Sequence, residues 1–225
     1  MVSVIIPTLN EEKALPQTFH NLFRQPGSFE VIVVDGGSLD RTSEIVRGEP
    51  RVRFLMAPKG RASQMNTGVR HATGEWLLFL HADTLLPDGA LARLNMLEPD
   101  SAVQAGGFLH QFSGRDWRLR LLSFFNNVRC RWSKIMYGDQ AIFVRRSLFE
   151  RLGGFPNEPV LEDVLFSRRL VRIVTPVLLA PPVITDARKF VQMGIWRSVF
   201  RASLILLAVE LGLPIGSRVF FREIR

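Results

Sequence analysis

The stretches that decide the fold are VIIPTLNEE at residues 4–12 and VIVVDGGSLDRT at residues 31–42. Each starts as an apolar, β-branched run and ends in polar and acidic residues. The run VIVV is apolar on both faces, which is typical of a central parallel strand that helices cover on both sides. The two stretches therefore predict an α/β sheet with polar side chains where its strands end.

Helical and strand-like patterns alternate outward from these stretches. Residues 15–23 place their apolar side chains at the spacing of one helix face, and further helices are expected from Asp40 and over residues 61–71. Strands are expected at residues 2–7, 29–35, 52–55 and 75–81. Strands that alternate with helices imply right-handed βαβ units and a mostly parallel, Rossmann-like sheet.

The second half of the chain is less regular. Strands are expected at residues 103–112 and 141–146, a basic and aromatic helix at 115–134, and another helix at 161–170. Residues 173–185 are uncharged and hold three prolines, which favours an extended segment. We expect one domain over residues 1–187, with halves at 1–112 and 113–187, and a helical tail at 188–225.

The composition is that of an ordinary globular chain. The 225 residues are 47% apolar and 22% charged, which suffices for a core and excludes a disordered or collagen-like protein. The single cysteine, Cys130, excludes an internal disulfide and a cysteine-based zinc cluster. The first residues have no basic region before their apolar run, so we expect no secretory signal and a cytoplasmic location.

The positive charge is unevenly distributed. The chain has 29 basic and 21 acidic side chains, a net charge of +8; residues 1–112 hold 10 and 12 of them and residues 113–225 hold 19 and 9. A half with net charge +10 indicates an anionic partner: a nucleic acid, a phosphate group or a membrane surface. We expect no nucleic acid, because the acids at the strand ends would repel its phosphates and the aromatic pattern of a base-stacking sheet is absent.

The tail is apolar with basic and aromatic flanks. Its apolar run, residues 202–217, is short for a membrane span, which needs roughly 20 apolar residues, and it contains Glu210 and Pro214. Arginines and aromatic residues on both sides favour a helix that lies on the inner face of the cell membrane. The alternative is a helix that packs on the sheet.

Chemistry-bearing residues follow the predicted strands, where ligands bind in open α/β sheets. Asp35 ends an apolar strand and is followed by glycines, which let a ligand approach the backbone. His81 and Asp83 alternate at a strand exit and point the same way, as two ligands of a divalent cation would. Glu162 and Asp163 open a helix whose dipole keeps a carboxylate ionised, as a general base requires.

Each of these motifs taken alone also fits a helix cap or a turn. The chain contains neither GxGxxG nor GxxxxGK[ST], so a nicotinamide, flavin or P-loop site is not supported. His110 has no partner acid near it in the sequence, and a role in the core is expected for it.

Four segments in this order resemble the family 2 glycosyltransferases, which have the GT-A fold: VIIPTLNEE (4–12), VIVVDGGSLDRT (31–42), GRASQMNTGVRHATGEWLLFLHADTLLP (60–87) and LEDVLFSRRL (161–170). The chain looks most like a small bacterial subgroup with LHADT and YGDQ segments. The resemblance covers residues 1–170. It implies a GT-A nucleotide-sugar-binding sheet, with a nucleotide-sugar half at 1–112 and an acceptor half at 113–187.

The resemblance also implies an inverting transfer of a sugar from a UDP- or GDP-linked donor. Asp163, with Glu162 beside it, would be the base that deprotonates the acceptor, and Asp139 is the rival base. Asp83 and His81 would hold Mn²⁺ or Mg²⁺; the family usually has an acid where His81 stands, which leaves the metal's identity and strict metal dependence open. The expected nucleotide-sugar-binding residues are Pro7, Thr8, Asn10, Glu11, Asp35, Gly37, Arg61, Asn66 and Ala82.

The acceptor side is expected in the second half. The basic and apolar character of that half favours a lipid acceptor, such as a polyprenyl phosphate, a carotenoid acid or a glycolipid, while a soluble metabolite or a protein stays open. Arg188 and Trp196 loosely resemble a C-terminal QxxRW element of the family, although its Gln is missing. The candidate acceptor residues are Tyr137, Gly138, Asp139, Gln140, Arg188 and Trp196.

Two other functions stay open beside this one. The first is a non-catalytic member of the same fold that binds a nucleotide or organises a membrane complex, which the unusual His81 favours. The second is a sugar-phosphate nucleotidyltransferase, which is disfavoured because those enzymes begin with a glycine-rich, basic loop after the first strand. The sequence does not name the sugar, the nucleotide, the acceptor or the oligomeric state.

Overall fold

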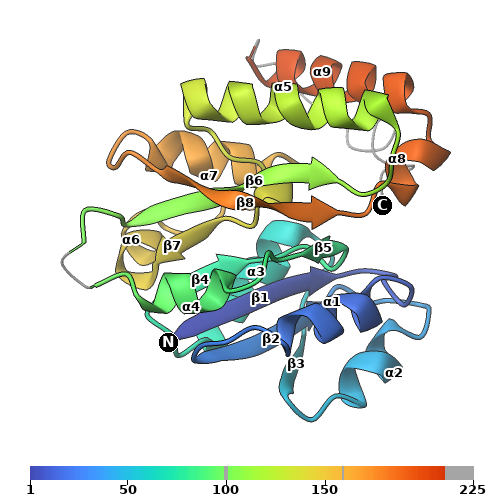
Figure 1. Cartoon of the computed structure of the whole chain (residues 1–225). Coiled ribbons are helices and arrows are strands. Elements are labelled where there is room, and N and C mark those ends of the chain that lie inside the picture. Colours follow the sequence, from blue (N-terminus) through green and yellow to red (C-terminus); the bar gives the residue numbers. More distant parts are fainter. Residues whose placement is uncertain (99–100, 159, 211–225) are drawn as a thin grey trace.

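A computed structural model describes residues 1–98, 101–158 and 160–210, and in this part the strands form one sheet in the order β3-β2-β1-β4-β7-β6-β8-β5 (Figure 1). β1 (Val2–Thr8) lies between β2 (Phe29–Asp35) and β4 (Trp76–Phe79), with β3 (Val52–Met56) beyond β2. These four strands are parallel, as the sequence predicts. Their carboxyl ends therefore meet at one edge of the sheet.

The apolar runs form strands because both of their faces are buried. On β1, Val4 and Ile6 pack into one core cluster and Ile5 packs into another on the opposite face. The first cluster contains the apolar stripe of α1 (Leu15–Leu22), and the second contains that of α3 (Arg61–His71). A central strand thus needs apolar side chains on both of its faces, which explains why VIVV lacks the alternation of a half-exposed strand.

The second half continues the same sheet with β7 (Phe143–Arg145), β6 (Ala105–Phe112), β8 (Val177–Thr185) and the short β5 (Thr84–Leu85). β6 and β8 are parallel, but β7 is antiparallel to both β4 and β6, and β5 is antiparallel to β8. The α/β sheet is confirmed; the run of parallel strands from β3 to β4 is interrupted by the antiparallel β7, and parallel pairing returns between β6 and β8.

The remaining helices cover this sheet. α2 (Thr42–Arg47) and α4 (Ala90–Asn95) pack on the first core cluster, and α6 (Arg146–Arg151) and α7 (Glu162–Leu170) on the second. α5 (Trp117–Ser133) lies against β6, where the Asn127 amide bonds both backbone groups of His110. β5 and α4 are not anticipated by the sequence patterns, because two and six residues are too few to show a periodicity.

The predicted helical tail begins as α8 (Arg188–Gln192) and α9 (Ile195–Glu210), and α9 lies beside α5 at one edge of the molecule (Figure 1). Leu119 of α5, Ala187 and Ile195 form a small apolar cluster that joins these segments. Within the described residues, no helix is both long and apolar enough to cross a membrane. Pro214 and the basic residues predicted to flank the tail at its end lie outside the described residues.

Candidate functional site

A cleft of about 390 Å³ lies at the carboxyl ends of β1 and β4. Its other walls come from the start of α3, the 3-10 turn η1 (Gly138–Gln140), the start of α7, and α8. The cleft brings together predicted residues of every class: Pro7, Thr8, Glu11, Arg61 and Ala82 for the nucleotide sugar, His81 and Asp83 for the metal, Asp163 for the base, and Tyr137, Gly138 and Asp139 for the acceptor.

The edge formed by β1 and β2 is held by one side chain of α3. Gln64 Nε2 donates to the carbonyl oxygen of Thr8 at 2.7 Å and to that of Val34 at 2.8 Å. Its amide therefore ties the last residues of both strands to the helix, and Gln64 itself lines the cleft. A Cβ on Gly36 would come within 3.1 Å of the Gln64 amide, which explains a glycine directly after Asp35.

His81, Gly138 and Asp163 meet inside the cleft. The backbone N–H of Gly138 donates to Asp163 Oδ2 at 2.5 Å, and the N–H of Val164 donates to Asp163 Oδ1 at 2.7 Å. A Cβ on Gly138 would lie 2.6 Å from His81 Nε2 and 3.1 Å from Asp163 Oδ2. The turn η1 thus approaches α7 closely because residue 138 has no side chain, and this contact fixes the Asp163 carboxylate.

The imidazole of His81 is neutral at pH 7. Burial lowers the pKa of His81 below its usual value of 6.5, and the nearby Arg61 guanidinium lowers it further against the opposing effect of three carboxylates. A neutral imidazole has one nitrogen free to accept a hydrogen bond or to bind a metal.

Arg61 is positioned by the acid that opens α7. Its Nε donates to Glu162 Oε1 at 2.9 Å, and the Glu162 side chain is only 3% exposed. Burial acts to lower the pKa of Arg61, but the carboxylates of Glu162, Asp163, Asp139 and Asp83 outweigh it and raise that pKa. Glu162, predicted beside the base, does not line the cleft; it holds the cation that does.

We expect Glu162→Gln to destabilise the fold by roughly 1–2 kcal/mol, because a charge-assisted hydrogen bond to a nearly buried carboxylate is lost while Arg61 stays partly solvated. Chemical denaturation monitored by circular dichroism measures this. The matched control is Glu44→Gln, which removes the exposed carboxylate that pairs with Arg41 and should leave the free energy of unfolding nearly unchanged. Equal effects of the two substitutions would contradict a positioning role for Glu162.

Lys189 of α8 brings a cation to the mouth of the cleft. Its Nζ lies 2.5 Å from Glu11 Oε1 and 3.7 Å from Asp83 Oδ2. Burial raises the pKa of Glu11, and the ammonium of Lys189 opposes that rise. Two acidic side chains from the ends of β1 and β4 thus share one ammonium, so this part of the cleft favours positive charge.

Asp139 of η1 also faces the cleft. Asp139 Oδ2 lies 3.5 Å from Nε2 of His110, which is fully buried, and Asp139 Oδ1 is buried with no hydrogen-bond partner among the described residues. His110 lies in the core, as expected, and the fold supplies a partner acid that the sequence spacing does not indicate, from 29 residues further along the chain. The neighbouring Tyr137 ring is covered by the Arg129 guanidinium at 3.6 Å.

Several predicted residues are not brought to the cleft. Asp35 is fully buried, and its carboxylate accepts hydrogen bonds from Thr8, Gly37 and Ser38. The Asn66 amide bonds both backbone groups of Phe155. The others outside the cleft lining are Gly37, whose N–H donates to Asp35, Asn10, which bonds the 38–39 loop, Gln140, which bonds Tyr137 and Phe108, Arg188, which pairs with Asp186, and the exposed Trp196.

The cleft also contains residues that the sequence patterns did not single out. The tail supplies a cation to the cleft, but this cation is Lys189 and not the predicted Arg188 beside it. Apolar lining comes from Phe112, Val160, Phe190 and Met193. Gln64 lies inside the segment 60–87 that resembles the family, and this position was its one signal in the sequence. The burial of its amide is seen only in the structure.

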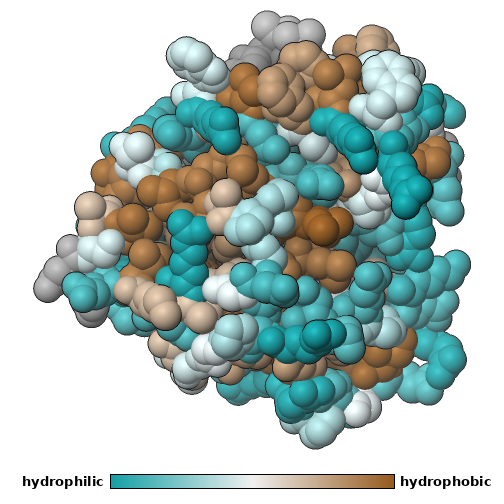
Figure 2. Space-filling view, in the orientation of Figure 1, coloured by the Kyte–Doolittle hydropathy of each residue, from teal (hydrophilic) through white to brown (hydrophobic). Residues whose placement is uncertain are grey.

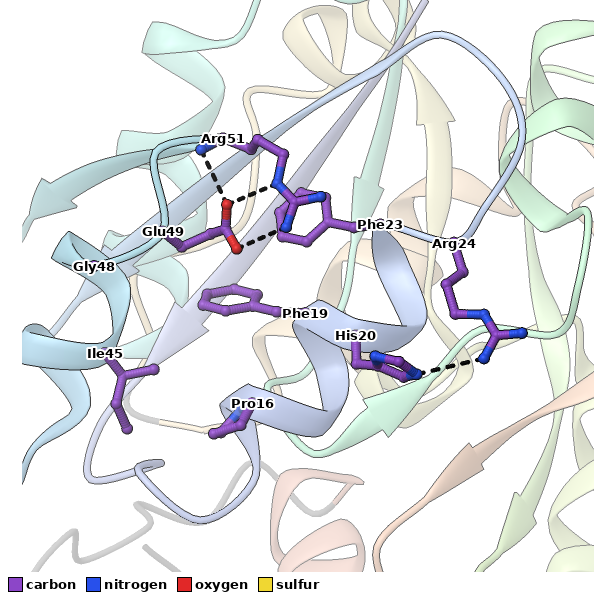
Figure 3. A pocket seen from close by; sticks show the side chains of 9 residues that line it. All are labelled: Pro16, Phe19, His20, Phe23, Arg24, Ile45, Gly48, Glu49 and Arg51. Carbon is purple, nitrogen blue, oxygen red and sulfur yellow. Dashed lines mark hydrogen bonds and ion pairs between the residues drawn. The ribbon is translucent and has the colours of Figure 1, made fainter.

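Another hollow, of about 540 Å³, lies between α1 and α2 on the outside of the molecule (Figure 3). Its charged residues contact one another: Arg51 pairs with Glu49 and covers the Phe23 ring at 3.7 Å, and Arg24 lies 3.4 Å from His20. Arg51, which lines this hollow, directly precedes β3, so the hollow lies at the amino end of that strand. Ligands of open α/β sheets bind at the carboxyl ends, so we place the functional site in the first cleft.

Known proteins resemble this chain in sequence. A PGL/p-HBAD biosynthesis glycosyltransferase of Mycobacterium bovis is 36% identical over 170 residues, which are 69% of this chain and 63% of that protein. A probable glycosyltransferase of Bacillus subtilis, YdaM, is 27% identical over 220 residues, which are 87% of this chain and 52% of that protein. The chain thus spans between half and two thirds of the length of these relatives.

Solved structures share the fold. The mannosyltransferase PcManGT from Pyrobaculum calidifontis, in complex with GDP-Man and Mn²⁺, matches with a TM-score of 0.62 at 29% identity, over 82% of this chain and 56% of that one. TarS 1-349 of S. aureus in complex with UDP-GlcNAc matches with a TM-score of 0.66 at 20% identity, over 99% and 70%. The model of the family described as "Glycosyl transferase family 2" matches residues 3–153. Because that match covers well over half of the chain, this protein belongs to glycosyl transferase family 2.

Proposed function

We propose that this protein is an inverting glycosyltransferase that moves a sugar from a UDP- or GDP-linked donor to a hydroxyl or acid acceptor. The observation that carries the proposal is the convergence of Asp163, Arg61 and Asp83 in one cleft at the carboxyl ends of β1 and β4. The relatives whose printed names are glycosyltransferases support it. So does a neighbour that was solved with GDP-Man.

The reaction is a single displacement. The acceptor oxygen attacks the anomeric carbon, the bond from that carbon to the diphosphate oxygen breaks, and the acceptor proton passes to Asp163. Two backbone N–H groups hold the Asp163 carboxylate, so it is oriented before the acceptor arrives. Arg61, fixed by Glu162, would stabilise the negative charge that grows on the leaving nucleoside diphosphate.

The acidic groups at the mouth of the cleft fit a divalent cation that takes most of its ligands from a diphosphate. Among the described residues, no group of three His, Cys, Asp or Glu side chains is placed to hold a metal. Asp83 supplies one carboxylate of the kind that Mg²⁺ and Mn²⁺ accept, with His81 close by in the turn and Glu11 across the cleft. A bound cation would neutralise charge on the diphosphate, a task that Lys189 would share.

We propose a lipid acceptor and a location at the inner face of the membrane. The apolar lining by Phe112, Phe190 and Met193 supports an acceptor with an apolar part. Phe190 belongs to α8 and Met193 directly follows it, and the chain then continues into the basic and aromatic α9. The predicted residues outside the cleft, such as Asp35 and Asn66, would act on the donor indirectly by holding the loops around it.

The donor prediction is tested by thermal unfolding with UDP, GDP, UDP-sugars and GDP-sugars, each with and without Mn²⁺. A donor at about 100 times its dissociation constant stabilises the native state by roughly 2.7 kcal/mol, which for a chain of this size raises Tm by roughly 5–10 °C. Asp83→Asn should remove the part of the shift that depends on Mn²⁺. The matched control, Asp88→Asn, changes an exposed acid five residues away that does not line the cleft.

The same experiment separates the remaining alternatives. If a nucleoside diphosphate raises Tm but no donor is ever turned over, the protein is a non-catalytic member of the family. If no nucleotide raises Tm at millimolar concentration, the proposed donor site is wrong. Release of pyrophosphate from a nucleoside triphosphate and a sugar phosphate would instead identify a nucleotidyltransferase.

A further inference from the structure

The outer face of α5 is unusually apolar for a surface helix. The Trp132 side chain is 86% exposed, Trp117 66%, Phe124 60% and Phe125 57%, and Leu121 is also exposed. At about 100° per residue these five side chains lie within an arc of about 100° on the helix. We call these five residues the α5 stripe. Large apolar side chains grouped on one exposed face mark an interaction surface.

The inner face of the same helix explains why the stripe points outward. Leu119, Ser123 and Cys130 are buried on the opposite side, where the Ser123 hydroxyl accepts a hydrogen bond from the N–H of Phe112 on β6. Asn127 bonds both backbone groups of His110. α5 is therefore fixed on the sheet by smaller and more polar residues than those it exposes. An alternative orientation of the helix would break these hydrogen bonds.

The charge around the stripe fits an anionic partner. α5 contains four arginines and no acidic residue, and two of the arginines, Arg120 and Arg131, are exposed along one margin of the stripe. The half of the chain that contains α5 has a net charge of +10. Aromatic residues interleaved with arginines suit the boundary between lipid headgroups and acyl chains, where rings are buried and guanidinium groups meet phosphates.

The neighbouring helix extends the same kind of surface. Trp196, Phe200 and Leu204 of α9 are exposed at intervals of four residues, and the exposed Arg197 lies among them. Figure 2 shows apolar residues gathered along the edge of the molecule that α5 and α9 form in Figure 1, with hydrophilic residues between them. Two helices with aromatic outer faces side by side make a surface broad enough to lie on a bilayer.

The surface lies on the acceptor side of the cleft. Arg129 of α5 covers the ring of Tyr137. The N–H of Phe112 donates to Ser123 of α5, and the Phe112 ring lies 4.9 Å from that of Phe190 of α8, measured between centroids. Tyr137, Phe112 and Phe190 all line the cleft. A bilayer on the α5 stripe would therefore lie next to the apolar wall through which a lipid acceptor reaches Asp163.

We propose that the α5 stripe is the surface by which this protein docks on an anionic lipid bilayer, with α9 beside it as a secondary contact. The inference rests on the membrane location proposed above and specifies which face meets the lipid. It assigns the principal role to α5, within the folded domain, and not to the tail.

The test is co-sedimentation of the full chain with vesicles of phosphatidylcholine alone or with one third phosphatidylglycerol. We expect binding to the anionic vesicles, weakened by salt, and a loss of about tenfold or more in the partition coefficient for the triple variant F124Q/F125Q/W132Q. R120E/R131E should lose a comparable amount on anionic vesicles. The matched control M96Q/I173Q removes two exposed apolar side chains elsewhere and should bind like the wild type.

The outcomes distinguish this inference from the function on which it rests. If the wild type binds no vesicle, the membrane location fails, and the inference with it, while donor stabilisation in the thermal assay is unaffected. If W196Q/F200Q or deletion of residues 211–225 abolishes binding and the triple variant does not, the tail is the anchor and the inference is overturned. If the wild type is a dimer and the triple variant a monomer, a second copy covers the stripe, which also overturns it.

Discussion

We expect Asp163→Asn to lower kcat by at least about 10²-fold while the protein remains folded and binds its donor. Asparagine keeps the shape of the side chain and one oxygen that accepts the hydrogen bond from Gly138 N–H, but it cannot take the acceptor proton. Asp163 is 8% exposed, and two backbone N–H groups fix its carboxylate. The substitution therefore removes a base that is already oriented for the reaction. Steady-state transfer at saturating donor measures the effect.

The control for this prediction is Asp139→Asn, which changes the other carboxylate of the acceptor side. Asp139 Oδ2 lies 3.5 Å from His110 Nε2, and Asp139 Oδ1, which no described residue hydrogen-bonds, suits the binding of a sugar or acceptor hydroxyl. We therefore expect Asp139→Asn to raise KM more than it lowers kcat. A large loss of kcat for Asp139→Asn together with equal rates for Asp163→Asn and the wild type would move the base to Asp139.

The second large effect is expected for Gly138→Ala, which adds one methyl group at the centre of the cleft. That methyl would lie 2.6 Å from His81 Nε2, 2.9 Å from His81 Cε1 and 3.1 Å from Asp163 Oδ2, so η1 must move away from α7 or the imidazole must turn. Either movement displaces the base by a fraction of an ångström or more. We expect a loss of about 10- to 10²-fold in kcat/KM, because catalysis falls steeply when reacting groups are misplaced by about 1 Å.

Backbone strain does not account for this effect. Gly138 is not among the glycines with positive φ, so alanine is compatible with its backbone and the cost comes from the contacts alone. The matched control is Gly48→Ala, at the end of α2, where a Cβ meets its nearest atoms at 3.5 Å and no change in activity is expected. Wild-type activity in Gly138→Ala, measured together with an unchanged Tm, would show that η1 and α7 need not touch for transfer.

Local sequence was sufficient to predict most elements of the first half. The observed β2 and α3 have the bounds that the sequence predicts; β2 contains a continuous apolar run, which is typical of a strand that helices cover on both faces. β5 and α4, also in the first half, were missed because two and six residues are too few to show a periodicity. The reversal of strand direction at β7 also has no local signature; it depends on which edge of the sheet the returning chain meets.

The candidate site was predicted in part. Arg61, Asp83 and Asp163 were expected there and line one cleft, because residues at strand ends and helix starts converge whenever parallel strands share an edge. Glu162 differs from Asp163 by a single position, and yet it turns away to hold Arg61. Successive residues of a helix point about 100° apart, so the choice between two adjacent acids is made by the orientation of α7.

The sequence by itself determined the α/β class, the family and the residue types available for chemistry, since these depend on patterns within short segments. Only the tertiary structure decided that Asp35 lies buried among hydrogen-bond donors, that Lys189 and not Arg188 meets Glu11 and Asp83, and that His110 has Asp139 as a partner. The contacts of His110 and Lys189 join residues 29 to 178 positions apart in the chain. The physical reason is that the direction of a side chain, and hence what it touches, is fixed by the packing of whole elements.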